Sequence, residues 1–172
     1  MVSLIAGSLV FPLHLRLSKP LEEPSQVCFP ASGNRDAELL DKGQFRVIHR
    51  VRDLPAPVRF RFTEKNGSRF VMADTGATFE TSDDIRDASI PMMRLIFAAE
   101  SPGATIVHYE HGGIGLYYVV EAFRTDSAAL RPLWRRVCSD KARDLRELRG
   151  MISSGKCAPE PPSYDGKPPC QE

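Results

Sequence analysis

The sequence predicts one α+β domain, in which an antiparallel sheet of roughly four to six strands is covered by a single C-terminal amphipathic helix. Three observations predict this fold class. Short segments carry apolar side chains at alternating positions, the pair Gly112-Gly113 separates two of them, and one amphipathic stretch lies near the C-terminus. With 42% hydrophobic and 26% charged residues, the 172-residue chain lies within the ordinary globular range.

Residues 1–18 allow two interpretations. Residues 2–13 are largely apolar, which is about the length of a signal-peptide core and too short to span a bilayer. Apolar side chains also stand at every second position from Leu9 to Leu17, as in a buried strand. We therefore expect either a signal peptide or an N-terminal strand, and no transmembrane span. Residues 19–36 are rich in Pro, Ser, Glu and Gly and are expected to form a linker.

The folded domain is expected to occupy residues 37–155. Its first predicted strand covers residues 45–51, where Phe45, Val47 and His49 share the apolar side. Because a buried polar group needs a partner, we expect His49 to lie in the core with its ring bonded to the backbone.

Residues 58–73 fit either a hairpin or a helix. In the hairpin, Asn66-Gly67 forms the turn between two alternating segments. In the helix, Leu54, Val58 and Phe62 share one face at spacings of four. The alternation of apolar and basic residues favours the hairpin.

The strongest local signal is a second hairpin around Gly112-Gly113, a pair that can adopt the positive φ angles of a tight turn. With these two glycines as the loop, Tyr109 pairs with Leu116. Residues 94–99 and 130–137 are expected to supply neighbouring strands of the same sheet.

Residues 140–154 are predicted to form the helix, with Leu148 and Ile152 on the side that covers the sheet. The residues expected at its ends are Ser139 or Asp140 as the N-cap and Gly155 as the terminator. The tail, residues 156–172, is rich in Pro and is expected to be extended, because Pro lacks a backbone N–H.

The four cysteines are Cys28, Cys138, Cys157 and Cys170. Their even number and the lack of a CxxC spacing favour disulfides over a metal cluster, so neither a metal nor a cofactor is expected. A helix over residues 140–154 would span about 22 Å, whereas a disulfide needs Cα atoms within about 7 Å. That disfavours a bond between the two cysteines that flank the helix. The remaining schemes are Cys28 with Cys138 plus Cys157 with Cys170, or Cys28 with Cys157 plus Cys138 with Cys170. The alternative is four reduced thiols in a cytoplasmic protein.

His108 and Glu110 share one face of the second hairpin, and His111 follows them. A histidine beside a carboxylate suits proton transfer near neutral pH, so His108 and Glu110 are the candidate acid and base of a hydrolase-type enzyme. Without catalysis, they form an ordinary polar hairpin end with His108 opposite Tyr117. Neither a nucleophile motif nor a phosphate-binding glycine loop occurs in the sequence. A pocket that joins this pair to His49, Asp83 or Asp84 would support the enzyme hypothesis.

Residues 131–156 contain eight Lys and Arg against three Asp and Glu. The candidate binding residues in this segment are Arg135, Arg136, Arg143 and Arg146. Their charge indicates an anion-binding module as a third interpretation. Helical pairs such as Arg143 with Glu147 give the alternative of a solvated helix face.

The leading functional hypothesis is a small exported protein, secreted or periplasmic, that binds a ligand and catalyses no reaction. It rests on the signal-like start, the even number of cysteines and the lack of catalytic motifs. The partner would be an unknown protein or an anionic ligand, and a net charge of +1 argues against nucleic acid. If the start is a strand and the thiols are reduced, we expect a cytoplasmic protein.

Overall fold

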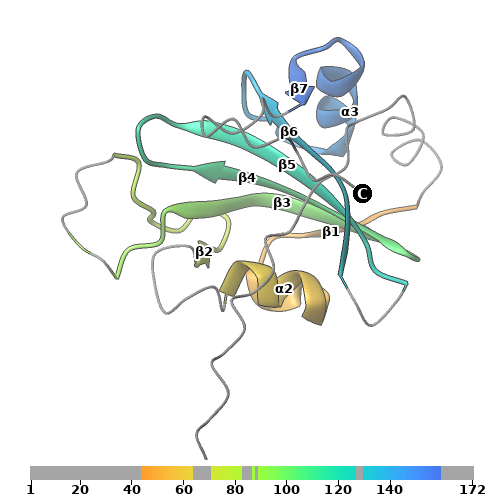
Figure 1. Cartoon of the computed structure of the whole chain (residues 1–172), viewed down its shortest axis with the longest axis horizontal. Helices are drawn as coiled ribbons and strands as arrows, with labels where there is room; N and C mark the ends of the chain where they lie inside the picture. The colour runs from red at the N-terminus through yellow and green to blue at the C-terminus, as the bar shows by residue number, and fades with distance from the viewer. Residues whose placement is uncertain (1–43, 64–70, 83–86, 88, 127–129, 160–172) are drawn as a thin grey trace, which may run out of the picture.

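The computed structural model describes residues 44–63, 71–82, 87, 89–126 and 130–159. They form one seven-stranded sheet with the strand order β1-β3-β4-β5-β6-β7, and β2 lies beside the start of β3 (Figure 1). In chain order the elements are β1 (Arg46–Ile48), the 3-10 helix η1 (Val51–Asp53), α2 (Ala56–Thr63), β2 (Met72–Ala73), β3 (Met93–Ser101), β4 (Ala104–His111), β5 (Tyr117–Arg124), β6 (Arg131–Cys138), α3 (Leu145–Ser153) and β7 (Cys157–Pro159). All strand pairs are antiparallel except β2 with β3.

The predicted fold class was wrong in its number of elements. Instead of four to six strands and one helix, the described residues form seven strands, two α-helices and a 3-10 turn. Part of the difference is β7, which lies where a tail was expected and is too short to carry a periodic signal. The rest is α2. The α+β composition and a C-terminal helix on the sheet agree with the prediction.

Helix α2 occupies part of the segment for which a hairpin was favoured, so the helical alternative is correct there. Leu54, Val58 and Phe62 stand four residues apart and are all buried against the sheet. The Phe62 ring lies edge-on to the rings of Tyr109 and Phe123. This apolar contact with two strands decides between two local patterns that the sequence leaves nearly equal. The expected Asn66-Gly67 turn lies outside the described residues.

The hairpin of β4 and β5 is confirmed, but its predicted register was wrong. His111 pairs with Tyr117, so residues 112–116 form the connection, and Tyr109 pairs with Val119 rather than Leu116. Gly112 is required by packing rather than by a two-residue turn, because a Cβ there would overlap the backbone carbonyl of Glu80. The predicted strands on both sides are confirmed as β3 and β6.

In β1, the predicted inward face was wrong. Ile48 is buried and pairs with Ala98 of β3, whereas Val47 and His49 are exposed. Since neighbouring residues of a strand point to opposite faces, only one of Val47 and Ile48 can reach the core. His49 is therefore not the core histidine that was expected.

Helix α3 begins later than predicted. Its N-cap is Asp144, whose carboxylate accepts a hydrogen bond from the Glu147 N–H at 2.8 Å, and not Ser139 or Asp140. The expected terminator is confirmed: Gly155 has a φ of 77°, in the left-handed region that ends many helices.

The two helices cover opposite faces of the sheet (Figure 1). We call these the α2 face and the α3 face. The α2 face includes the buried residues Val58, Phe62, Tyr109, Val119 and Phe123. The α3 face includes Ile106, Val120, Trp134, Leu148 and Ile152. Each face of the central strands therefore has its own apolar core.

Several predictions fall outside the described residues: the signal peptide or strand at 1–18, the linker at 19–36, the domain start near Ala37, Cys28, and the tail with Cys170 beyond residue 159. They stay predictions.

Candidate functional site

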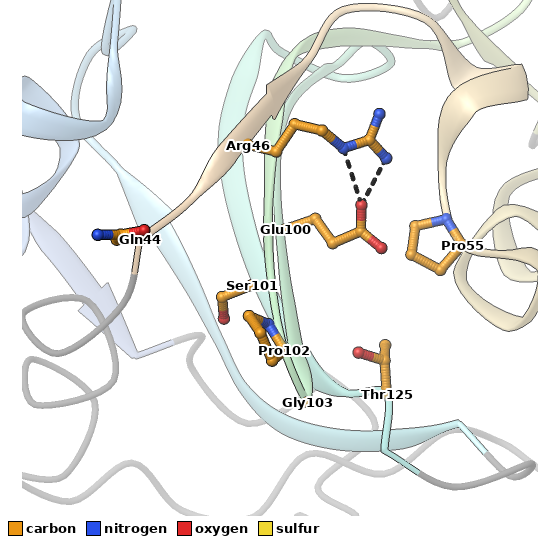
Figure 2. A pocket seen from close by; sticks show the side chains of 8 residues that line it. All are labelled: Gln44, Arg46, Pro55, Glu100, Ser101, Pro102, Gly103 and Thr125. Atoms are coloured by element: carbon orange, nitrogen blue, oxygen red, sulfur yellow. Dashed lines mark hydrogen bonds and ion pairs between the residues drawn. The ribbon is translucent and has the colours of Figure 1, made fainter.

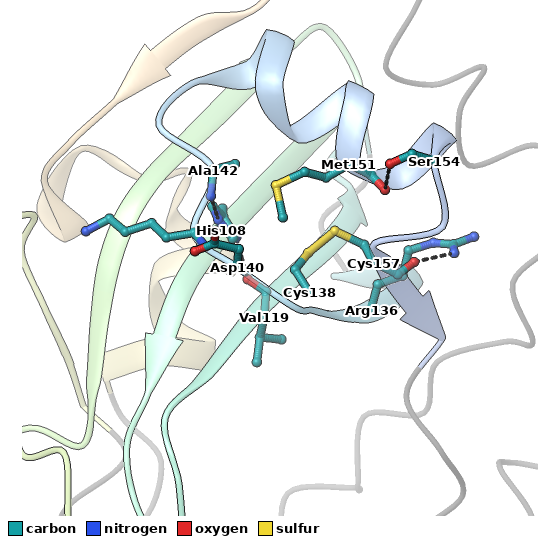
Figure 3. The surroundings of a disulfide bond; sticks show 10 residues. His108, Val119, Arg136, Cys138, Asp140, Ala142, Met151, Ser154 and Cys157 are labelled. Carbon is teal, nitrogen blue, oxygen red and sulfur yellow. Dashed lines mark hydrogen bonds between the residues drawn. A yellow bond between two sulfur atoms is a disulfide. The ribbon is translucent and has the colours of Figure 1, made fainter.

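His108 lies fully buried in the middle of β4, on the α3 face (Figure 3). Its Nε2 is 3.1 Å from the backbone nitrogen of Ala142, which can only donate. Nε2 is therefore the acceptor, and the proton resides on Nδ1, which donates to the Val119 carbonyl at 2.9 Å. Both ring nitrogens thus hold backbone groups, one on β5 and one in the segment before α3.

Burial lowers the pKa of His108 to about 4, and the positive charge of Lys141 acts in the same direction. The hydrogen bond to Val119 and the charge of Glu110 oppose that shift without reversing it. His108 is therefore neutral at pH 7. With both nitrogens engaged and the ring covered, it links the sheet to the α3 segment and has no nitrogen left for a substrate.

Glu110, two residues further along β4, is also buried and lies between two cations. Its carboxylate is 2.6 Å from Arg94 Nε and 3.4 Å from Lys141 Nζ. Arg94 also lies 4.2 Å from the ring centroid of Phe79. The candidate acid and base therefore share a face, as predicted. However, His108 is bonded to backbone groups, whereas Glu110 is paired with Arg94 and Lys141. His108 also stands opposite Val120, not Tyr117.

The structure does not bring His49 to this pair. His49 is exposed beyond β1, and Asp83 and Asp84 lie outside the described residues. The acid–base hypothesis therefore stays a prediction without geometric support.

On the α2 face, a buried ionic network surrounds Glu121 of β5, a residue that the sequence analysis did not select. Its carboxylate accepts a hydrogen bond from the Tyr109 hydroxyl at 2.7 Å and two from the Arg61 guanidinium at 2.9 and 3.1 Å. Arg135 Nε lies 3.1 Å from the same carboxylate, at ion-pair distance but without hydrogen-bond angles. Burial and the carboxylate raise the pKa of Tyr109, so its hydroxyl remains a donor. One signal was present in the sequence, because Glu121 is the single charged residue within the run Tyr117–Phe123.

The four candidate binding arginines do not converge. Arg135 and Arg136 are consecutive in β6 and point to opposite faces, where Arg135 contacts the Glu121 network and Arg136 donates to the Cys157 carbonyl at 3.0 Å. Arg143 pairs with Glu147 at 2.9 Å, and Arg146 is exposed on α3. The anion-binding hypothesis therefore gains no shared surface from these residues.

Cys138 and Cys157 form a disulfide that joins β6 to β7 (Figure 3). Both predicted pairing schemes were wrong, since each gives Cys138 another partner. The two residues stand directly opposite each other in the sheet, with their Cα atoms 3.9 Å apart. Helix α3 spans only Leu145–Ser153, so neither cysteine lies at an end of the helix. The residues on its two sides bring the chain back to the same place.

A pocket of about 470 Å³ lies at the end of the sheet near the β3–β4 turn (Figure 2). Its lining residues are Gln44, Arg46, Pro55, Glu100, Ser101, Pro102, Gly103 and Thr125. Arg46 and Glu100 are register partners on β1 and β3, and their side chains are joined by two hydrogen bonds to one carboxylate oxygen. The pocket therefore presents a guanidinium, a carboxylate and hydroxyl groups to solvent.

Within the described part of the chain, no group of three or more His, Cys, Asp and Glu side chains is arranged to hold a metal ion. No helix among the described residues is both long enough and apolar enough to cross a membrane. Neither a protein-family model, nor a curated protein, nor a solved structure matches the chain.

Proposed function

We propose that the chain is a small exported protein that binds a ligand and catalyses no reaction. The observation that carries this proposal is the disulfide between Cys138 and Cys157. Disulfides form and persist mainly in oxidising compartments outside the cytosol. Both cysteines are buried, so the bond is shielded from small reductants and suits a structural role.

The non-catalytic part of the proposal is supported by the state of His108 and Glu110. A general base must have a free lone pair within reach of a substrate. His108 instead uses both nitrogens for backbone groups, and the Glu110 carboxylate is held by Arg94 and Lys141.

The ligand site that we propose is the pocket around Arg46 and Glu100. The charges of these two side chains cancel, which favours a ligand that carries both charges or none over a strongly charged one. Arg46 offers donors, Glu100 offers acceptors, and Ser101 and Thr125 can do both. A small zwitterion or a neutral polar molecule fits this chemistry.

Export is tested by producing the full chain in a host with an oxidising secretory compartment and analysing the protein that leaves the cytosol. We expect the exported chain to have lost residues from its N-terminus and to contain the Cys138–Cys157 linkage in a non-reduced peptide map. A chain that stays in the cytosol with Met1 intact and these thiols reduced contradicts the proposal.

Ligand binding is tested by calorimetric titration with a panel of free amino acids and neutral sugars. We expect at least one of them to bind, and Arg46→Gln to abolish that binding. The matched control is Arg124→Gln, because Arg124 forms an exposed ion pair with Asp126 outside the pocket. Equal loss in both variants, or no binding by the wild type, contradicts this site.

A further inference from the structure

The connection between β4 and β5 lies at one end of the sheet (Figure 1). It exposes apolar side chains. The run from Gly112 to Tyr117 reads Gly-Gly-Ile-Gly-Leu-Tyr and contains no charged residue. Ile114 is 90% exposed, Leu116 44% and Tyr117 46%. We call these three residues the apolar tip. Exposed apolar side chains that gather in one short segment often mark a contact surface.

The base of the tip is held in place by its neighbours. The Gly112 N–H donates to the Met92 carbonyl at 2.8 Å, and the Gly112 backbone packs so closely on Glu80 that no Cβ fits between them. Met92 also packs against Gly113, and the ring of Tyr117 lies near Gly115. The exposure of Ile114 is therefore a consequence of how the connection is built onto the sheet.

We propose that the apolar tip inserts into an electrically neutral lipid surface. The order of its side chains suits such a surface, because the apolar Ile114 stands at the apex and Tyr117 at the base. A tyrosine ring prefers the boundary between acyl chains and headgroups, where its apolar body and its hydroxyl are both accommodated.

The size of the tip favours lipid over a protein partner. A stable protein interface buries about 800 Å² on each partner, which three side chains on a narrow turn do not supply. Insertion into a fluid interface needs only a few apolar side chains, because lipid adapts to a convex shape.

The charges near the base of the tip are the reason why we propose a neutral rather than an anionic lipid surface. The Glu80 backbone lies against Gly112. The buried carboxylate of Glu110, with its partners Arg94 and Lys141, lies one residue pair below the tip. With both signs present, the rim gives no preference for anionic lipid. This inference is independent of the proposed pocket ligand.

The test is flotation of the full chain with vesicles of phosphatidylcholine alone. The double variant Ile114→Asp/Leu116→Asp is expected to lower the vesicle-bound fraction by about tenfold or more, given the apolar area that it removes. The matched control is Phe60→Asp. Phe60 is also apolar and is 60% exposed, but it belongs to α2 and is far from the tip in the sequence. We expect this variant to bind as the wild type does.

The comparison between variants decides the outcome, because residues 2–13 are also apolar. Binding that persists in the double variant, or that Phe60→Asp lowers equally, overturns the proposal. So do a wild type that does not float and binding that needs anionic lipid and disappears in high salt. A wild-type dimer that the double variant converts to monomer, without vesicle binding, assigns the tip to a second copy instead.

A second measurement reports insertion directly. Leu116→Trp adds a fluorophore to the tip, while the native Trp134 is buried and gives a constant background. We expect a blue shift with neutral vesicles and quenching by brominated acyl chains. An emission spectrum that vesicles leave unchanged contradicts insertion.

Discussion

Both faces of the sheet bury a carboxylate between two cations, Glu121 on the α2 face and Glu110 on the α3 face, but among the described residues the α3 face also buries a histidine. On the α2 face, the Glu121 carboxylate lies 2.9 Å from Arg61 Nε and 3.1 Å from Arg135 Nε. On the α3 face, His108 is neutral and bonded to two backbone groups, and a disulfide closes the segment that carries the helix. A charged network is sensitive to the loss of one partner, whereas a neutral buried histidine is sensitive to pH. The comparison therefore predicts different responses to mutation, reduction and acid.

The largest expected effect is on the α2 face. Glu121→Gln leaves two partly buried guanidinium groups without their carboxylate, and we expect the free energy of unfolding to fall by about 3 kcal/mol or more. Urea unfolding followed by circular dichroism measures the change. Asp126→Asn is the control, since its exposed pair with Arg124 should contribute less than about 0.5 kcal/mol. If the two losses are equal, the Glu121 network is as well hydrated as a surface pair.

Removal of the disulfide is the next largest effect, and it should act on the α3 face. Cys138 and Cys157 are 19 residues apart, and a crosslink of such a loop contributes about 3 kcal/mol. In Cys138→Ser/Cys157→Ser, we expect faster amide hydrogen exchange in α3 and β7 and unchanged exchange in α2. Equal acceleration in all three elements would mean that the crosslink stabilises the whole domain rather than one face.

The distinction between the faces is sharpest in acid. Burial lowers the pKa of His108 from 6.5 to about 4. As the pH falls, His108 is therefore protonated in the unfolded chain before it is protonated in the folded one. The contribution of neutral His108 to the free energy of unfolding is fully present above pH 6.5 and decreases as the pH falls toward 4. At 1.36 kcal/mol per pKa unit, the loss approaches about 3 kcal/mol near pH 4.

Chemical unfolding at several pH values measures this loss in the wild type, in His108→Gln and in His49→Gln. Between pH 6.5 and 4, the free energy of unfolding should fall less steeply with pH in His108→Gln than in the wild type. We expect no such change in His49→Gln, because His49 is exposed. An unchanged slope in His108→Gln assigns the acid sensitivity to the carboxylates.

The parts of the fold that could be predicted are those in which apolar residues recur at a regular spacing over many consecutive positions. The hairpin of β4 and β5 and the helix α3 both have such a spacing, and both exist near the expected positions. Val58 and Phe62 satisfy a strand and a helix equally, since four residues are two strand repeats and about one helical turn. Only the contact of Phe62 with Tyr109 and Phe123 resolves the choice, and a local pattern does not contain it.

The Glu121 network and the disulfide could not be predicted for a related reason. Arg61, Tyr109, Glu121 and Arg135 come from four different elements, and the sheet register alone brings three of them together. Likewise, Cys138 and Cys157 meet because the chain turns back on both sides of α3. In contrast, the predicted sharing of one face by His108 and Glu110 needed only the strand period.

Substitution of Gly112 tests the connection that leads from the sheet to the apolar tip. In Gly112→Ala, the methyl group would overlap the backbone carbonyl of Glu80, so backbone atoms would have to shift to make room for it. We expect a loss of about 1–3 kcal/mol, as for an overpacked core position. Thermal unfolding measures it, and a wild-type melting temperature would mean that the segment around Glu80 moves aside freely.

The smallest expected effect is that of Gly150→Ala, which should stabilise the protein rather than destabilise it. Gly150 lies inside α3, where an added Cβ meets nothing within 4 Å. Because glycine is less favourable than alanine in a helix interior, Gly150→Ala should raise the free energy of unfolding by up to about 1 kcal/mol. The gain should appear as slower hydrogen exchange in α3 without a change in α2. A stabilisation of both helices would show that the two faces unfold as one cooperative unit, and the contrast between them would then describe their chemistry but not their local stability.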